Sequence, residues 1–201
     1  MINSAETRKS LLAAARNEFA RHGFEGARVD RIADRANVNK AMIYYHFGSK
    51  ERLYKAVVED HIAGIGDYIE GVLRREMTID EFVLELASFY TRLFSDREFL
   101  PIFLRELAAG GVHVREIILN TISQKRLTEK LKDYFRVEMN YGRIRKVNIE
   151  HAIISFIGMN VFYIAVSSIA NQIWEIEDAE SFLYDRPRQV ADIFLNGLKA
   201  K

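Results

Sequence analysis

Apolar residues recur every three to four positions along much of the chain, which is the spacing of amphipathic α-helices. The pattern is clearest from Val29 to Ala36, where the apolar residues fall on one helical face. Residues 37–39 interrupt it, and a short second helix is predicted from about Lys40 to Phe47. Gly48 is placed to end that helix, and Ser49 is placed to cap the next one. The stretch therefore predicts helix, tight turn, short helix, second turn and long helix.

Helices are also predicted on both sides of this stretch, and no segment stands out as β-rich. The first is expected to begin at Ser4 or Thr7. Thr78 and Glu81 have the spacing of a capping box, which opens a helix. Pro187 is expected to open the last helix at its first turn. Further helices are predicted over residues 50–75, 78–93, 99–109, 114–139 and 152–173. The predicted fold class is therefore all-α.

The pair of helices around residues 37–39 is typical of a helix-turn-helix that reads DNA. Its second helix carries basic and aromatic side chains, namely Lys40, Tyr44, Tyr45 and His46. These make poor core material, because buried polar atoms need hydrogen-bond partners. The N-terminal helix would be the third helix of this unit, against which the other two pack. We therefore predict a three-helix helix-turn-helix DNA-binding domain over residues 1–50 and a larger helical effector-binding and dimerisation domain over residues 51–201.

Charge is distributed unevenly, although the formal net charge of the whole chain is only +1. Residues 1–55 hold eleven lysines and arginines and six acidic residues, a balance of +5. The rest of the chain holds 18 basic and 22 acidic residues and carries −4. A basic N-terminal quarter on an acidic body is typical of a protein that presents one end to a polyanion.

The composition argues against several classes of function. Hydrophobic residues make up 49% of the chain, so disorder is not expected. The absence of cysteine excludes disulfides, thiolate metal sites and a cysteine nucleophile. The five histidines are scattered and no catalytic motif is present, so we expect no metal site, no cofactor and no enzyme. The N-terminus lacks the apolar core of an export signal, and we expect a cytoplasmic protein.

Residues Ala152 to Ile173 contain no charged side chain, and this length would span a bilayer. Several polar residues within the stretch, among them Ser155, Asn160 and Gln172, favour instead a helix covered by protein. The last helix also has an apolar stripe. Two terminal helices with more apolar surface than one small bundle can hide predict a homodimer through a four-helix interface.

The sequence around the turn resembles the signature of the TetR family of transcriptional regulators. The resemblance covers residues ~5–58 and rests on Ile32-Ala33, Val38-Asn39-Lys40, Ile43-Tyr44-Tyr45-His46-Phe47 and Ser49-Lys50-Glu51. Two positions depart from the family pattern. Ala27-Arg28 stand where the family has a Ser or Thr cap, and Asn37 stands where it has Gly, although Asn tolerates the left-handed conformation. The rest of the chain is similar only in length and helical character.

The resemblance implies that Lys40, Tyr44, Tyr45 and Lys50 meet phosphates or bases, and the sequence leaves open which tyrosine contacts DNA. Lys50 also stands at a helix N-terminus, where backbone N–H groups favour an anion. Lys40 suits a guanine, whereas Ala41 and Met42 suit thymine methyl groups. The predicted DNA-binding residues are Arg28, Asn39, Lys40, Ala41, Met42, Tyr44, Tyr45, His46 and Lys50.

The resemblance also implies a small-molecule effector that binds in the C-terminal region. Ligand cavities are mostly apolar with a few placed polar groups. Aromatic residues at helical spacing suit an ordinary core equally well, so the resemblance, rather than the spacing, predicts a pocket. The abundance of aromatic residues favours a hydrophobic or aromatic compound. The candidate ligand-binding residues are Phe99, Phe103, Arg105, His113, Phe135, Phe156, Met159, Asn160 and Tyr163.

Together these features predict a homodimeric repressor that binds a palindromic operator and is released by its effector. Two other classes remain open. One is a DNA-binding structural protein without sequence preference, whose binding would depend steeply on salt. The other is a helical small-molecule carrier or enzyme with a vestigial N-terminal unit, which would have no affinity for DNA.

Overall fold

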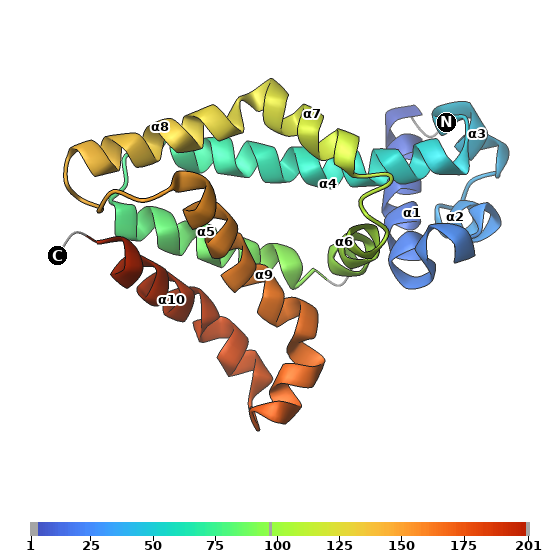
Figure 1. Ribbon diagram of the computed structural model, residues 1–201. Coiled ribbons are helices and arrows are strands. Elements are labelled where there is room, and N and C mark those ends of the chain that lie inside the picture. The colour runs from blue at the N-terminus through green and yellow to red at the C-terminus, as the bar shows by residue number, and fades with distance from the viewer. Residues whose placement is uncertain (1–3, 97, 200–201) are drawn as a thin grey trace. The chain divides into compact units, whose positions relative to one another are not determined.

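The computed structural model describes residues 4–96 and 98–199. Within these ranges all regular secondary structure is helical apart from one isolated antiparallel bridge, Ile144–Lys199, so the all-α prediction is confirmed (Figure 1). The helices are α1 (Ser4–Gly26), α2 (Val29–Arg35), α3 (Ala41–Phe47), α4 (Lys50–Leu73), α5 (Ile79–Phe94), α6 (Phe99–Ala108), α7 (Arg115–Lys125), α8 (Leu127–Asn140), α9 (Ile149–Ile173) and α10 (Ala179–Leu198).

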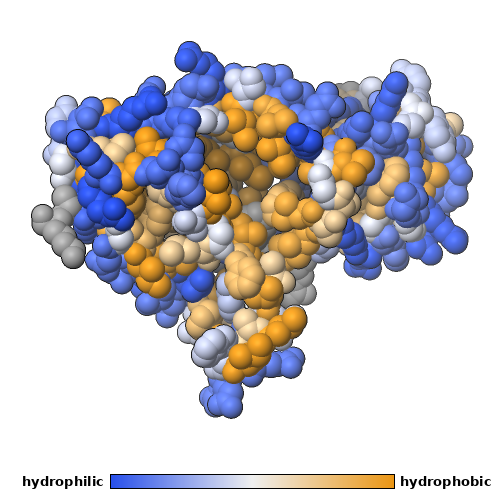
Figure 2. Space-filling view, viewed as in Figure 1, coloured by the Kyte–Doolittle hydropathy of each residue, from blue (hydrophilic) through white to orange (hydrophobic). Residues whose placement is uncertain are grey.

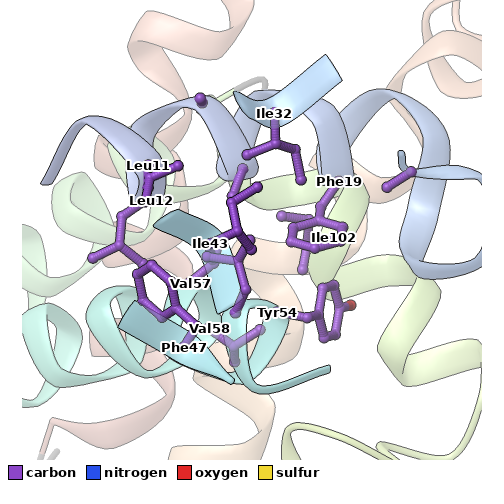
Figure 3. Close-up of a cluster of buried hydrophobic side chains, with 14 of the residues drawn as sticks. Leu11, Leu12, Phe19, Ile32, Ile43, Phe47, Tyr54, Val57, Val58 and Ile102 are labelled. Atoms are coloured by element: carbon purple, nitrogen blue, oxygen red, sulfur yellow. The ribbon is translucent and has the colours of Figure 1, made fainter. Parts of the chain in front are cut away.

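The first of two compact units comprises Met1–Ile65 and Asp96–Thr121. It holds α1, α2, α3, the first part of α4, α6 and the start of α7. Phe19, Ile32 and Ile43 have no exposed surface and bring α1, α2 and α3 into one apolar cluster (Figure 3). Ile102 of α6 is buried in the same cluster. A segment distant in sequence therefore completes the core of the helix-turn-helix.

The second compact unit comprises Gly66–Ser95 and Ile122–Lys201. Its centre is α5, which packs against both α9 and α10. Phe82 of α5 is buried, and the rings of Phe156 and Phe194 join α9 to α10 with centroids 4.9 Å apart. The domain boundary predicted at residue 50 falls at the start of α4, inside the first unit. That DNA binding and effector binding are divided at this residue stays a prediction.

Several predicted helix ends are confirmed because their signals are local. The Thr78 Oγ1 atom accepts a hydrogen bond from the Glu81 amide at 3.3 Å, and Glu81 Oε2 accepts one from the Thr78 amide at 2.8 Å. This is the predicted capping box. The Arg52 amide donates to Ser49 Oγ at 3.1 Å, as expected of a cap. Helix α4 also continues through its three glycines without a break.

Two predicted helices are wrong in their extent. The expected helix over residues 114–139 is two helices, because Arg126 adopts the left-handed conformation (φ 50°, ψ 39°) and ends the regular hydrogen-bond pattern. Pro187 does not open the last helix but lies inside α10. That helix starts earlier because the Asp178 side chain accepts hydrogen bonds from the amides of Glu180 and Ser181, at 3.1 and 2.9 Å.

Helix α9 is covered by its own chain on only part of its circumference. Ile154, Phe162, Ile169 and Ile173 are each more than 60% exposed. Their spacing places them within about a third of a turn of one another, on one helical face. Figure 2 shows hydrophobic side chains over this helix. By length and composition alone α9 is long and apolar enough to cross a membrane, but a core helix of a soluble protein meets the same criterion.

Candidate nucleic-acid interface

The turn between α2 and α3 is formed by asparagines. Asn37 has φ 53°, so it adopts the left-handed conformation expected where the family has Gly. The amide of Val38 then reaches back to the carbonyl of Ala33 at 3.0 Å. The Asn39 Oδ1 atom accepts a hydrogen bond from the Ala41 amide at 2.8 Å. These bonds satisfy backbone groups at both sides of the turn and fix the start of α3.

Helix α3 has one buried and one exposed face. Ile43 and Phe47 are buried, and the Arg8 guanidinium lies 5.3 Å from the centroid of the Phe47 ring. Tyr44 and Tyr45 lie on the other side, 47% and 76% exposed. Large aromatic side chains left in solvent on a short, anchored helix are available to a partner. The exposed face of α3 is therefore the candidate reading surface.

The two lysines predicted to meet DNA are both engaged within the chain. Lys40 Nζ lies 2.8 Å from Asp30 Oδ1, and this hydrogen bond raises the pKa of Lys40 above its ordinary value. Lys50 Nζ donates to the Glu25 carbonyl at 3.2 Å and lies 4.9 Å from the centroid of the Phe24 ring. Both contacts are at the surface, where water and phosphate compete with them.

The predicted DNA-binding residues, the two lysines included, fall into two groups by exposure. Met42, His46 and Lys50 are partly buried, and among the described residues no hydrogen-bond partner is found for the buried His46 Nε2 atom. The exposed residues are Arg28, Asn39, Lys40, Ala41, Tyr44 and Tyr45. The structure thus places most of the predicted DNA-binding residues on α3 or in the turn that precedes it. Their part in DNA binding remains a prediction.

Glu18 is a positioning residue that the sequence pattern does not indicate. Its carboxylate is buried in α1, and Oε1 accepts a hydrogen bond from the Arg28 backbone amide at 3.2 Å. Arg31 Nη1 lies 3.5 Å from the same oxygen. Glu18 therefore caps the start of α2, where Arg28 has no side-chain cap of its own. A distant carboxylate replaces the Ser or Thr that the family pattern has at this position.

Helix α6 is joined to the helix-turn-helix by two consecutive charged residues. Arg105 Nη1 donates to the carbonyls of Phe19 and Ala20, at 3.1 and 2.8 Å. These lie in the last regular turn of α1, because Gly23 (φ 67°, ψ 179°) leaves the helical conformation. Carbonyls at a helix end need partners, and a cation suits them. Arg105 thus supplies hydrogen-bond donors to the carbonyl groups at the end of the regular part of α1.

Glu106 is the second of these residues, and its carboxylate is buried. The Tyr54 hydroxyl donates to Glu106 Oε1 at 2.8 Å, and the His113 amide donates to Oε2 at 3.1 Å. The His113 ring Nδ1 also lies 3.0 Å from Oε1. Burial raises the pKa of Glu106, but these hydrogen bonds lower it by more, so the pKa lies below its ordinary value. Helix α6 therefore holds α4 through Tyr54.

The predicted ligand-binding residues are divided between the two units. Phe99, Phe103, Arg105 and His113 belong to the first unit. There Arg105 and His113 make the contacts just described, and Phe99 stacks on His61 with ring centroids 4.9 Å apart. The members in the second unit are Phe135, Phe156, Met159, Asn160 and Tyr163. The part of all nine in ligand binding remains a prediction.

An apolar cavity of about 40 Å³ lies inside the second unit. Phe135 and Phe156 line it, and so does Ile69 of α4. Tyr90 is its polar exception, and burial raises the pKa of this phenol to about 12, so it stays neutral. The sequence pattern missed the contribution of α5, whose residues at this wall are Phe82, Val83, Leu86 and Tyr90. Within the residues described, no cluster of three potential metal ligands occurs.

Comparison with known proteins identifies the N-terminal region. Residues 11–57 match the family described as bacterial regulatory proteins, tetR family. The chain is 38% identical over 112 residues to the HTH-type transcriptional repressor NicS from Pseudomonas putida. That alignment covers 55% of this chain and 52% of NicS, so the chain spans about half the length of this curated relative.

Solved structures share the fold of the whole chain. FadR from Bacillus subtilis, in complex with stearoyl-CoA, has a TM-score of 0.73 at 18% identity, covering 94% of this chain and 98% of that one. The fatty acid degradation regulator FadR from Bacillus halodurans has a TM-score of 0.72 at 19% identity, covering 95% and 99%. At these identities the likeness concerns the fold. The N-terminal region, residues 11–57, thus matches the tetR family of bacterial regulatory proteins, and the chain shares its overall fold with these solved structures.

Proposed function

We propose that the protein is a cytoplasmic transcriptional regulator, a repressor that binds a palindromic operator as a homodimer and is released by a small apolar effector. The observation that carries this proposal is the exposed face of α3, with Tyr44 and Tyr45 in solvent on a helix anchored by Ile43 and Phe47. A short helix of this kind, entered through a tight turn, fits the major groove. The family match over residues 11–57 supports the same function.

The homodimer is proposed from the uncovered face of α9. Four large apolar residues there are each more than 60% exposed and follow one helical face. Gly158 lies on this helix, and among the described residues no atom beyond the adjacent helix backbone lies within 4 Å of where its Cβ would be, which allows a second helix to approach closely. A contiguous apolar stripe of this kind marks a protein interface. A two-fold axis through it gives a symmetric reader of a palindrome.

The effector is proposed to enter the apolar cavity of the second unit. Its walls offer aliphatic and aromatic side chains and the neutral phenol of Tyr90, so a hydrophobic or aromatic compound suits it. An acyl chain, such as that of the stearoyl-CoA bound to FadR from Bacillus subtilis, is one such group. The cavity is only about 40 Å³, so it must widen to accept a ligand. Ligand binding would therefore displace the residues of its walls.

Helix α4 is the proposed route from effector to DNA. It is continuous from Lys50 to Leu73, follows α3 after two intervening residues, and contributes Ile69 to the cavity wall. A ligand that displaces Ile69 therefore acts on the same helix that holds Tyr54. A coupling free energy of about 1–3 kcal/mol would change operator affinity about 5- to 150-fold.

The test is selection from random double-stranded DNA with the purified protein at near-physiological salt. An enriched palindrome is expected, with half-site centres about one helical turn apart. Binding that persists without enrichment and collapses as salt rises would favour the nonspecific DNA-binding protein instead. Absence of binding under all conditions, with small-molecule binding retained, would favour the carrier.

Tyr45→Ala is expected to weaken operator binding about tenfold or more while leaving thermal stability nearly unchanged. The side chain is 76% exposed, so its removal costs the fold little. Each base that a side chain reads in the major groove is worth about 1–3 kcal/mol. Electrophoretic or fluorescence titration of the selected operator measures the effect. Tyr141→Ala, a matched change of another exposed tyrosine, is the control and should leave affinity within about twofold.

Ile157→Phe is expected to reduce effector binding about tenfold or more by filling the cavity that Ile157 lines. Helix α3 belongs to the first unit, so operator affinity without effector should remain within about threefold. The measurement is release of labelled operator by a panel of hydrophobic and aromatic compounds. Equal sensitivity of the variant and the parent protein to every active compound would contradict the placement of the effector.

A further inference from the structure

Asp30 and Lys40 form an ion pair across the helix-turn-helix. Lys40 Nζ lies 2.8 Å from Asp30 Oδ1, and the side chains are 45% and 64% exposed for Lys40 and Asp30 respectively. Asp30 is in the first turn of α2, and Lys40 immediately precedes α3. A carboxylate beside a reading surface repels the phosphates of the DNA that the surface approaches. Asp30 nevertheless lies next to Lys40 at the start of α3, which indicates that its carboxylate acts through this lysine and offsets the repulsion.

We propose that Asp30 is a specificity-determining positioning residue, which holds the Lys40 ammonium at the start of α3 and directs it to uncharged acceptors on base edges. The inference rests on the proposed function, because it concerns how the same surface distinguishes an operator from other DNA. Asp30 acts through Lys40 and needs no contact of its own with DNA.

The physical reason lies in the two kinds of acceptor that DNA offers. An unrestrained lysine is a flexible point charge that binds any phosphate within reach, which adds affinity without sequence information. When Asp30 offsets this charge, the attraction to phosphate weakens. An ammonium has three N–H donors, so a bond to Asp30 leaves two for a neutral acceptor. In the major groove, guanine O6 and N7 are such acceptors.

The position of Lys40 agrees with this role. Residues at the start of a recognition helix are the ones that face base edges. The preceding Asn39 caps the helix through the Ala41 amide, so the backbone from which Lys40 extends is fixed. Asp30 then restrains the long side chain itself. Backbone and side chain are both held before DNA arrives, which lowers the entropy cost of binding.

The test compares Asp30→Asn with Asp34→Asn. Asp34 is also exposed and lies one turn further along α2, and within the described part of the chain no ion pair involves it. Both substitutions remove one negative charge from the same helix, but only the first releases Lys40. Affinity is measured for the selected operator, for operators with each base pair replaced in turn, and for an unrelated duplex. Thermal unfolding confirms that both variants fold.

Both variants are expected to bind unrelated DNA more tightly, since each lacks a charge that repels phosphate. Only Asp30→Asn should lower the ratio of operator affinity to unrelated-DNA affinity, by about fivefold or more, with the effect concentrated at one G·C position in each half-site. In a Lys40→Met background, Asp30→Asn should change this ratio by less than about twofold, because the residue through which it acts is gone.

Two results would overturn the inference while leaving the proposed function intact. One is an equal change of the ratio in Asp30→Asn and Asp34→Asn, which would mean that only net charge matters. The other is an undiminished effect of Asp30→Asn in the Lys40→Met background. If the parent protein selects no sequence at all, the proposed function and this inference fall together.

Discussion

Glu106→Ala is expected to destabilise the first unit by about 2–4 kcal/mol. The substitution leaves the Tyr54 hydroxyl and the His113 amide without the acceptor that each has at 2.8 and 3.1 Å. Tyr54 is buried, so water cannot replace the missing carboxylate. Hydrogen exchange of the α1 and α4 amides measures the effect directly. The thermal midpoint should fall by roughly 5–15 °C, at about 2–4 °C per kcal/mol.

The matched control is Glu116→Ala, which removes an exposed carboxylate from α7 in the same unit. Its effect on the free energy of unfolding should stay within about 0.5 kcal/mol. Glu106→Gln should fall between the two, because the amide oxygen still accepts from Tyr54 but carries no charge. If Glu106→Ala and Glu116→Ala are equally stable, the hydrogen bonds of Glu106 do not hold α6 to α4.

The same carboxylate makes the first unit sensitive to acid. Burial raises the pKa of Glu106, but the hydrogen bonds from Tyr54 and His113 lower it by more, to below its ordinary value. The folded protein therefore binds this proton less tightly than the unfolded chain does. The stabilisation is present above the unfolded pKa of about 4.3 and is lost as pH falls through the folded value. Between about pH 6 and pH 3, wild type should lose more stability than Glu106→Gln.

The sequence predicts those parts of the site that depend on local backbone chemistry. Asn37 takes the left-handed conformation and Ser49 caps α4, as expected from residue type alone. The buried face of α3 follows from the spacing of Ile43 and Phe47. Each of these features involves residues within a few positions of one another, so the chain pattern contains the required information.

The sequence does not predict features that depend on distant pairs. Glu18 caps α2 from ten residues away, and Arg105 meets the end of α1 from more than eighty. Helical periodicity gives the face on which a side chain lies but not the helix that will oppose it. Arg126 shows the same limit, because a left-handed arginine breaks an otherwise continuous helical pattern and no Gly or Pro marks the position.

Phe162→Asp is expected to convert the proposed dimer into a monomer and to weaken operator binding about 100-fold or more. Phe162 is 70% exposed near the middle of the apolar stripe of α9. A two-fold axis places two aspartates in one apolar interface, where each loses hydration without gaining a partner. Without the dimer, bivalent binding of two half-sites becomes monovalent binding of one. Sedimentation measures assembly, and titration of the full operator measures affinity.

Leu119→Asp is the matched control, since Leu119 is 56% exposed on α7 and belongs to the first unit. This variant should remain dimeric, because a charge in solvent carries no desolvation cost. Binding to a single half-site separates assembly from DNA contact. Phe162→Asp should bind one half-site within about threefold of wild type, because α3 belongs to the other compact unit. A Phe162→Asp protein that remains dimeric would place the interface elsewhere, since an apolar stripe at a two-fold axis does not tolerate paired like charges.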